Sequence, residues 1–232
     1  MTLNDLYLLS PELSTASLAV LLLLVDLFAP RKGTVAAIGI LGLGIPLALT
    51  IALWTGGVVV PDHSILAGAF TVDKFSLFFK FLFVSVAAAV TLMSNDYGTR
   101  FRKFHAEYLA LMLFSVSGMM LLASASELVT VYISLELTAL PVAALAAFLR
   151  NSRSSEAGMK FLILSGISSA LLLYGMVLVY GFTGTTQLEE IAARLGEMTL
   201  GDDQPFGSYA LLVATALIVA GFGFKITAVP FQ

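Results

Sequence analysis

Two charged residues lie inside apolar stretches of the sequence, where a charge is costly. Glu136 lies near the middle of the apolar stretch 127–149, and Lys225 lies in a second apolar stretch, 208–232. A charge near the centre of a bilayer costs on the order of 3 kcal/mol on insertion scales, so an intramembrane ionisable residue is first interpreted as functional. A glutamate and a lysine on separate membrane spans are the components of a proton path.

The neighbours of Glu136 favour a polar environment. Pro141 is expected to break its helix near Glu136. It cannot donate a hydrogen bond to the carbonyl of Leu137, so a backbone acceptor beside Glu136 is left for water or another helix. Polar side chains also occur close to Glu136 in the sequence: Tyr132, Ser134 and Thr138. The alternative is a carboxylate that is paired only to hold two helices together.

The sequence around Lys225 has the same character. Pro230 frees the carbonyl of Ile226 and favours a break in the helix. Gly221 lies one turn before Lys225 on the same face, so a neighbouring helix or a column of water can approach closely. Transporters place their ion sites at such broken helices.

Composition requires a membrane protein. The chain is 59% hydrophobic and 12% charged, and its mean hydropathy is +0.97. The apolar residues come in blocks of roughly 20, the length of a membrane-spanning helix, without the alternation of barrel strands. We therefore predict an all-α polytopic transmembrane bundle, a single membrane domain over residues 1–232. The predicted spans are 8–28, 34–54, 75–93, 107–125, 127–149, 156–180 and 208–232.

Basic residues predict the orientation of these spans. They concentrate in the connections after the first, third and fifth spans: Arg31, Lys32, Arg100, Arg102, Lys103, Arg150 and Arg153. By the positive-inside rule these connections face the cytoplasm, so the N-terminus is expected outside. The first span lacks a basic segment before it and is expected to be an uncleaved helix.

Two further lysines lie within predicted spans. Lys80 is about a turn and a half into its span, and we expect it to reach the outer surface by extending along its own aliphatic stem, with a functional role as the less favoured alternative. Lys160 is four residues after Glu156, the spacing of a surface ion pair on a helix, so a surface role and a functional role stay open. The hydroxyls that follow it, Ser165, Ser168 and Ser169, could support a short chain of water or simply allow close helix packing.

Other site types are disfavoured. The chain contains no cysteine, so it offers no thiolate ligands for an iron–sulfur cluster. Neither His63 nor His105 has a carboxylate or histidine at ligand spacing, so no metal site is predicted. Close helix packing explains the glycines of the second span better than a nucleotide-binding loop does. These glycines are Gly39, Gly42 and Gly44.

Several stretches of the sequence resemble one family of membrane proteins. They surround the intramembrane charges and continue through the loops: Val131 to Pro141, Ser155 to Phe161, Tyr174 to Thr186 and Phe224 to Phe231. Two N-terminal segments fit the same pattern, Pro11 to Leu13 and Val72 to Lys80. Together they are similar to the antiporter-like subunits of complex I, and in particular to the subunit N family of bacterial NADH:quinone oxidoreductases, the counterpart of mitochondrial subunit 2.

The resemblance implies a proton-translocating membrane-arm subunit of respiratory NADH:quinone oxidoreductase, located in the bacterial plasma membrane or an equivalent energy-transducing membrane. It assigns proton transfer to Glu136 and Lys225 as a charge pair and places Lys160 on the same polar axis. It also implies that NADH, FMN, iron–sulfur clusters and quinone belong to partner subunits and that this chain binds no cofactor. The partners are then other membrane-arm subunits and the lipid bilayer, with no nucleic acid.

The sequence departs from this family in its extent. Family members contain two inverted repeats, whereas this sequence stops after the motif around Lys225. We therefore expect a truncated product, a split gene or a partial chain, which supplies half of a proton route. Two other function classes stay open. One is a membrane subunit of a cation/proton antiporter or membrane-bound hydrogenase, and the other is a non-catalytic membrane fragment.

Overall fold

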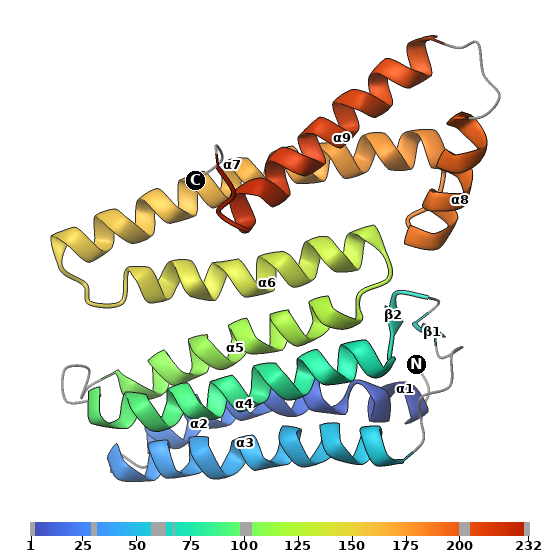
Figure 1. Ribbon diagram of the computed structural model, residues 1–232. Helices are drawn as coiled ribbons and strands as arrows, with labels where there is room; N and C mark the ends of the chain where they lie inside the picture. The colour runs from blue at the N-terminus through green and yellow to red at the C-terminus, as the bar shows by residue number, and fades with distance from the viewer. Residues whose placement is uncertain are drawn as a thin grey trace.

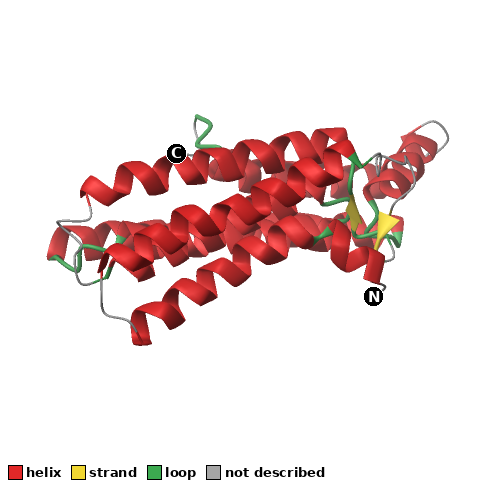
Figure 2. Ribbon diagram, turned by 90° about the horizontal axis from the view of Figure 1, so that it is seen from below, coloured by secondary structure: helices red, strands yellow, loops and turns green. Residues whose placement is uncertain are grey.

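The chain folds into a bundle of helices that lie side by side, with the connections at two ends (Figure 1, Figure 2). The computed structural model describes residues 3–28, 32–56, 64–66, 68–97, 104–199 and 205–229. In chain order the elements are α1 (Leu3–Leu8), α2 (Ser10–Phe28), α3 (Lys32–Thr55), β1 (Ser64–Ile65), β2 (Phe70–Thr71), α4 (Lys74–Tyr97), α5 (His105–Ser124), α6 (Leu128–Ala146), α7 (Ser152–Thr183), α8 (Leu188–Thr199) and α9 (Pro205–Lys225). The all-α polytopic fold expected from composition is confirmed.

The helices α2 to α7 account for the first six predicted spans. Within the described ranges, six helices are long and apolar enough to cross a membrane, and the seventh span corresponds to a shorter apolar helix, Tyr209–Lys225. The outward faces agree with a lipid environment: on α7, Ile163 and Ile167 are each more than half exposed, although both are aliphatic. A helix that is apolar around most of its circumference is typical of a membrane span.

The last span ends earlier than the sequence predicted, at Lys225 rather than at Gln232. Thr227 adopts a positive φ of 53°, and its N–H bonds to the carbonyl of Phe224, while the N–H of Ala228 bonds to the carbonyl of Gly223. These two bonds are those of a Schellman motif, which terminates a helix. The predicted break at Pro230 lies outside the described residues.

Two elements at one end of the bundle were not predicted. The strands β1 and β2 form a short antiparallel hairpin, and α8 places Leu188, Ile191 and Leu195 on one face at helical spacing. Backbone hydrogen bonds tie the α5–α6 connection to both regions, because Ser126 N–H donates to Ala69 and Leu188 N–H donates to Ser126. The hairpin, α8 and α1 therefore share one end of the molecule (Figure 1).

Capping interactions at both ends of α7 determine where this helix begins and ends. At its start, the side chain of Asn151 accepts a hydrogen bond of 2.8 Å from the N–H of Ser154, as an N-cap does. At its end, Gly184 adopts φ 67° and its N–H bonds to the carbonyl of Tyr180. Glycine tolerates this left-handed conformation at no steric cost, so the helix ends there.

Side chains from α2, α3, α4 and α5 form the largest buried cluster, which includes Leu22, Leu43, Val84 and Leu109. A second cluster joins α6, α7, α8 and α9 through Leu128, Leu172, Ile191 and Ala214. Helix α6 packs against α5 on one side and α7 on the other, so it lies between the two groups (Figure 1).

The two ends of the bundle differ in charge. Arg150 and Arg153 lie at the α6–α7 turn, and the acidic residues Glu189 and Glu190 lie on α8 at the opposite end (Figure 1). This separation agrees with the loop charges used to predict orientation. The other basic loop residues lie outside the described residues or have undescribed side chains, and the outside location of the N-terminus stays a prediction.

Candidate intramembrane charged site

Glu136 and Lys225 are brought into direct contact. The Nζ atom of Lys225 lies 3.1 Å from Oε1 of Glu136 and donates a hydrogen bond to it. The Lys225 side chain is 10% exposed and that of Glu136 is 24% exposed, so water is largely excluded from the pair. Residues 89 positions apart in sequence thus form one ionic site between α6 and α9.

Helix α7 completes this site with two buried hydroxyls. Ser169 donates a short hydrogen bond to Oε1 of Glu136, and Lys225 Nζ donates to Oγ of Ser165 at 3.3 Å. The two serines are four residues apart and therefore lie on one face of α7. The carboxylate accepts from a cation and a hydroxyl together, so three helices converge on the pair.

Glycines allow α7 and α9 to approach closely enough for this contact. A Cβ atom at Gly221 would lie 2.6 Å from Cβ of Leu172, and one at Gly175 would lie 2.9 Å from the carbonyl oxygen of Ala214. Ser168 adds a 2.8 Å hydrogen bond to the carbonyl of Gly221. The close approach expected at Gly221 is confirmed, and it occurs one turn before Lys225.

Helix α6 does not break at Pro141, so the predicted helix break at that residue is wrong. The helix continues to Ala146. Helix α5 supports this region, because Ser115 Oγ donates to the carbonyl of Thr138 at 3.1 Å. A Cβ at Gly118 would lie 3.0 Å from the carbonyl carbon of Leu137. Helix α5 thus packs closely against α6 beside the proline, and α6 stays continuous there.

Lys225 occupies the last position of α9, where the helix dipole favours a cation. The backbone beyond it is irregular, since the chain turns at Thr227. Membrane proteins tolerate an irregular backbone at depth where it is buried in protein or lines a hydrated cavity. The end of α9 therefore places the ammonium group beside non-helical backbone, as expected for an ion site.

Lys160 is not brought to the pair. Its Nζ lies 2.6 Å from Oε1 of Glu156, and both side chains are more than 60% exposed. This is the surface ion pair that the i, i+4 spacing allows. Among the described residues no contact joins Lys160 to Glu136 or Lys225, although all the hydroxyls that serve the pair lie further along the same helix.

The contacts of the pair differ from those suggested by sequence proximity. Thr138 donates to the carbonyl of Ser134 within α6, whereas the groups that touch Glu136 come from α7 and α9. Ser165 and Ser169 were expected to support a chain of water or close helix packing, and contact with the Glu136–Lys225 pair was not predicted. The available sequence signal for these contacts was the i, i+4 spacing of the two serines, on a span that also carries glycines.

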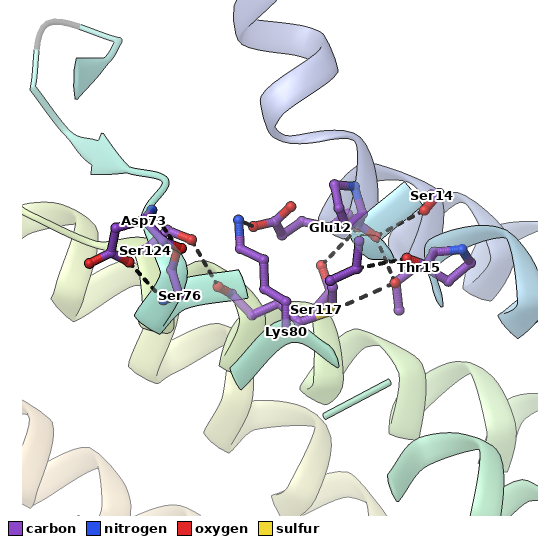
Figure 3. Close-up of polar contacts among 12 residues, drawn as sticks. Glu12, Ser14, Thr15, Asp73, Ser76, Lys80, Ser117 and Ser124 are labelled. Atoms are coloured by element: carbon purple, nitrogen blue, oxygen red, sulfur yellow. Dashed lines mark hydrogen bonds and ion pairs between the residues drawn. The ribbon is translucent and has the colours of Figure 1, made fainter. Parts of the chain in front are cut away.

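A second buried ion pair was not predicted from the sequence. Lys80 is fully buried rather than extended to the surface, and its Nζ lies 2.6 Å from Oε1 of Glu12, which is 2% exposed (Figure 3). The expectation that Lys80 reaches the membrane surface is therefore wrong. The available signal was a polar stripe on α4, in which Asp73, Ser76 and Lys80 recur at helical spacing.

The histidines do not form a metal site in the described ranges. His63 lies outside them, and His105 begins α5. In these ranges no group of three or more His, Cys, Asp or Glu side chains is placed to hold a metal ion.

Comparison with known proteins relates the chain to respiratory membrane subunits. A family model described as "NADH:quinone oxidoreductase/Mrp antiporter, TM" matches residues 125–232. The NADH-quinone oxidoreductase subunit N of Moorella thermoacetica is 40% identical over 232 residues, covering 98% of this chain and 46% of the relative. The subunit N of Dehalococcoides mccartyi is 37% identical over 223 residues, covering 96% of this chain and 45% of the relative. The chain thus spans about half the length of these relatives.

Solved structures agree. A chain of respiratory complex I from Thermus thermophilus, solved with bound aureothin, aligns with a TM-score of 0.72 and 28% identity, covering 95% of this chain and 45% of that one. The Mrp complex from Dietzia aligns with a TM-score of 0.72 at 22% identity, covering 100% of this chain and 42% of that one, which supports the fold alone. The chain is similar to the antiporter-like membrane subunits of NADH:quinone oxidoreductases, and its similarity to subunit N extends over almost its whole length.

Proposed function

We propose that this chain moves protons as a membrane-arm subunit of a respiratory NADH:quinone oxidoreductase, with Glu136 and Lys225 as its proton-exchange pair. The observation that carries the proposal is the 3.1 Å contact between two charges from separate membrane spans. The similarity to subunit N relatives at 37–40% identity supports this complex over the alternatives. The similarity to the Mrp complex supports the alternative of an antiporter subunit only at the level of fold.

The pair can act as a switch because its Coulomb energy depends on separation. At 3.1 Å and an effective dielectric constant of about 20, two unit charges attract by about 5 kcal/mol. Separation of the ammonium from the carboxylate weakens this attraction, so Glu136 then takes up a proton more readily. Reapproach of Lys225 favours release of that proton.

Two hydroxyls on α7 give each charge of the pair a second hydrogen-bond partner. Ser169 holds the Glu136 carboxylate and Ser165 accepts from Lys225, so each charge keeps a partner on α7 when the other charge moves. A swing of the Lys225 side chain away from Glu136 toward Ser165 would open the ion pair without leaving either group in an apolar environment. Lys160, further toward the start of α7, is proposed as a more peripheral member of the same path.

In this proposal the electron-transfer cofactors, which are FMN, iron–sulfur clusters and quinone, belong to partner subunits. The chain itself supplies ionisable side chains and no cysteine ligands. Movements transmitted from those partners would displace α9 and drive the switch.

The test is proton pumping in membrane vesicles that carry the assembled complex. The variants are Glu136→Gln and Lys225→Ala, with NADH oxidation and assembly monitored in parallel. Glu190→Gln and Lys74→Ala are matched controls. Both residues are exposed, and the two substitutions remove the same types of charge as the site variants do. We expect both site variants to lose pumping in an assembled complex and both controls to retain it. Normal pumping by assembled site variants would refute the proposal and leave the non-catalytic membrane fragment as the better explanation.

A further inference from the structure

Glu12 and Lys80 form a second ionic site, separate from the first. Glu12 lies in the first turn of α2 and Lys80 lies on α4, with 2.6 Å between Oε1 and Nζ. The two side chains are 2% and 0% exposed, so this pair is more deeply buried than Glu136 and Lys225. Figure 3 shows the Lys80 side chain extending toward the Glu12 carboxylate.

The pair has hydrogen-bonding capacity that the protein does not fill. Its ion-pair contact is not aligned as a hydrogen bond, and in the described part of the chain neither carboxylate oxygen of Glu12 nor Nζ of Lys80 has a hydrogen-bond partner. An ammonium has three donors and a carboxylate about four acceptor positions. Because buried polar atoms are normally hydrogen-bonded, water is the ligand whose donors and acceptors match these unfilled positions.

Stability alone does not explain the pair. Along α4, Lys80 lies between Leu77 of one buried apolar cluster and Val84 of another. Apolar residues would fill this position at least as favourably as a buried ion pair does. Intramembrane charges of this kind are a functional site by default.

A polar stripe leads from the pair to the end of the bundle. Asp73, Ser76 and Lys80 occupy positions i, i+3 and i+7, which share one face of α4. Asp73 is exposed and Ser76 is fully buried. The Ser76 hydroxyl donates to the carbonyl of Asp73, and the Ser76 N–H donates to the Asp73 carboxylate at 2.7 Å. Ser76 and Lys80 are one helical turn apart, roughly 5–6 Å between Cβ atoms, a gap that a single water can bridge.

Helices α3 and α5 place no competing charge beside the pair, whereas α1 carries Asp5 seven residues before Glu12. Ser117 on α5 donates to the carbonyl of Glu12 at 3.3 Å, and Thr15 on α2 donates to the carbonyl of Pro11. The sequence of α5 from Leu109 to Ser124 contains no ionisable residue, and neither does that of α3 after Lys32. The charge state of the pair therefore depends on Glu12, Lys80, Asp5 and access from Asp73.

We propose that Glu12 and Lys80 form a second proton-exchange site, which binds water and is reached from Asp73 where α4 begins. Proton transfer from the Lys80 ammonium to the Glu12 carboxylate leaves a neutral amine and a neutral carboxylic acid. Uptake of one proton through Asp73 and Ser76 then restores the ammonium. Release of the Glu12 proton returns the ionised pair, so the cycle is balanced.

The direct test is infrared difference spectroscopy of the assembled complex after a pH jump, in H₂O and D₂O. The wild type should show a titrating carboxyl band that is lost in Glu12→Gln and shifted in Lys80→Met. Lys74→Met removes a nearby exposed lysine and should leave the band unchanged. Identical spectra for wild type and Glu12→Gln would overturn the proposal.

A double variant separates proton exchange from a purely structural role and remains informative if the single variants fail to assemble. Glu12→Gln/Lys80→Met removes both charges together, so neither is left unpaired in the core. We expect this variant to assemble and to take up fewer protons per electron transferred than the wild type. Wild-type proton uptake by the double variant would reduce the pair to a structural contact. The infrared band of Glu12 does not depend on Glu136, so failure here is distinguishable from failure of the proposed function.

Discussion

Gly221→Ala should weaken the Glu136–Lys225 contact without removing a charge. The added Cβ would lie 2.6 Å from Cβ of Leu172, whereas ordinary contacts are 3.4 Å or longer, so α9 must move by about an ångström. Such overpacking typically costs 1–3 kcal/mol, partly offset by the roughly 1 kcal/mol better helix propensity of alanine. If the pair widens from 3.1 Å by the same amount, its attraction falls from about 5 to about 4 kcal/mol at an effective dielectric constant of about 20.

The expected result is a roughly five- to tenfold change in the equilibrium between the closed and open pair, since the change of about 1 kcal/mol is somewhat less than the 1.4 kcal/mol that corresponds to a factor of ten. The assay compares proton pumping per NADH oxidised and thermal stability of the assembled complex. Gly166→Ala is the matched control, because a Cβ there meets nothing within 4 Å, and it should be neutral or slightly stabilising. Equal pumping and stability in the two alanine variants would refute the view that close packing at Gly221 sets the geometry of the pair.

Three further predictions follow from individual contacts. Ser169→Ala removes a donor to the Glu136 carboxylate, a contact of a type that contributes about 1.5–3 kcal/mol. It should lower pumping more than Ser168→Ala, which loses only a bond to a backbone carbonyl; equal pumping in the two would contradict this assignment. Asn151→Ala removes the N-cap of α7 and should destabilise the protein by about 1 kcal/mol in thermal unfolding, while Asn151→Asp retains the cap and should not. Lys160→Ala should reduce pumping whereas Glu156→Gln should not, because an exposed pair contributes only 0–1 kcal/mol; matching effects would make Lys160 a surface charge only.

The fold was predictable because membrane spans are long and continuous in composition. Six helices coincide with predicted apolar blocks, and the central positions of Glu136 and Lys225 marked them as unusual before any contact was known. The short elements were not predictable in the same way. Helix α8 and the β hairpin depend on local backbone bonds to the α5–α6 connection, which a hydropathy pattern does not contain.

The partners of the charged residues could be identified only from the three-dimensional structure. Lys80 was expected at the surface because a lysine near the end of a span can extend to water, but Glu12 on another helix offers a counterion in the core. Pro141 was expected to break α6, yet the helix stays continuous where α5 packs closely against it at Gly118. In both cases a neighbouring helix contacts this part of the span, and sequence spacing within one helix carries no information about that neighbour.

The central claim is that Glu136 and Lys225 exchange protons rather than only join α6 to α9. Its most direct test is the double variant Glu136→Gln/Lys225→Met in the assembled complex, measured as protons translocated per NADH oxidised. Removal of one charge leaves the other unpaired in the bundle, a change that typically costs 3–5 kcal/mol for a buried pair, whereas removal of both avoids that cost. We predict that the double variant assembles and fails to translocate its share of protons. An assembled double variant that translocates protons as the wild type does would contradict the account.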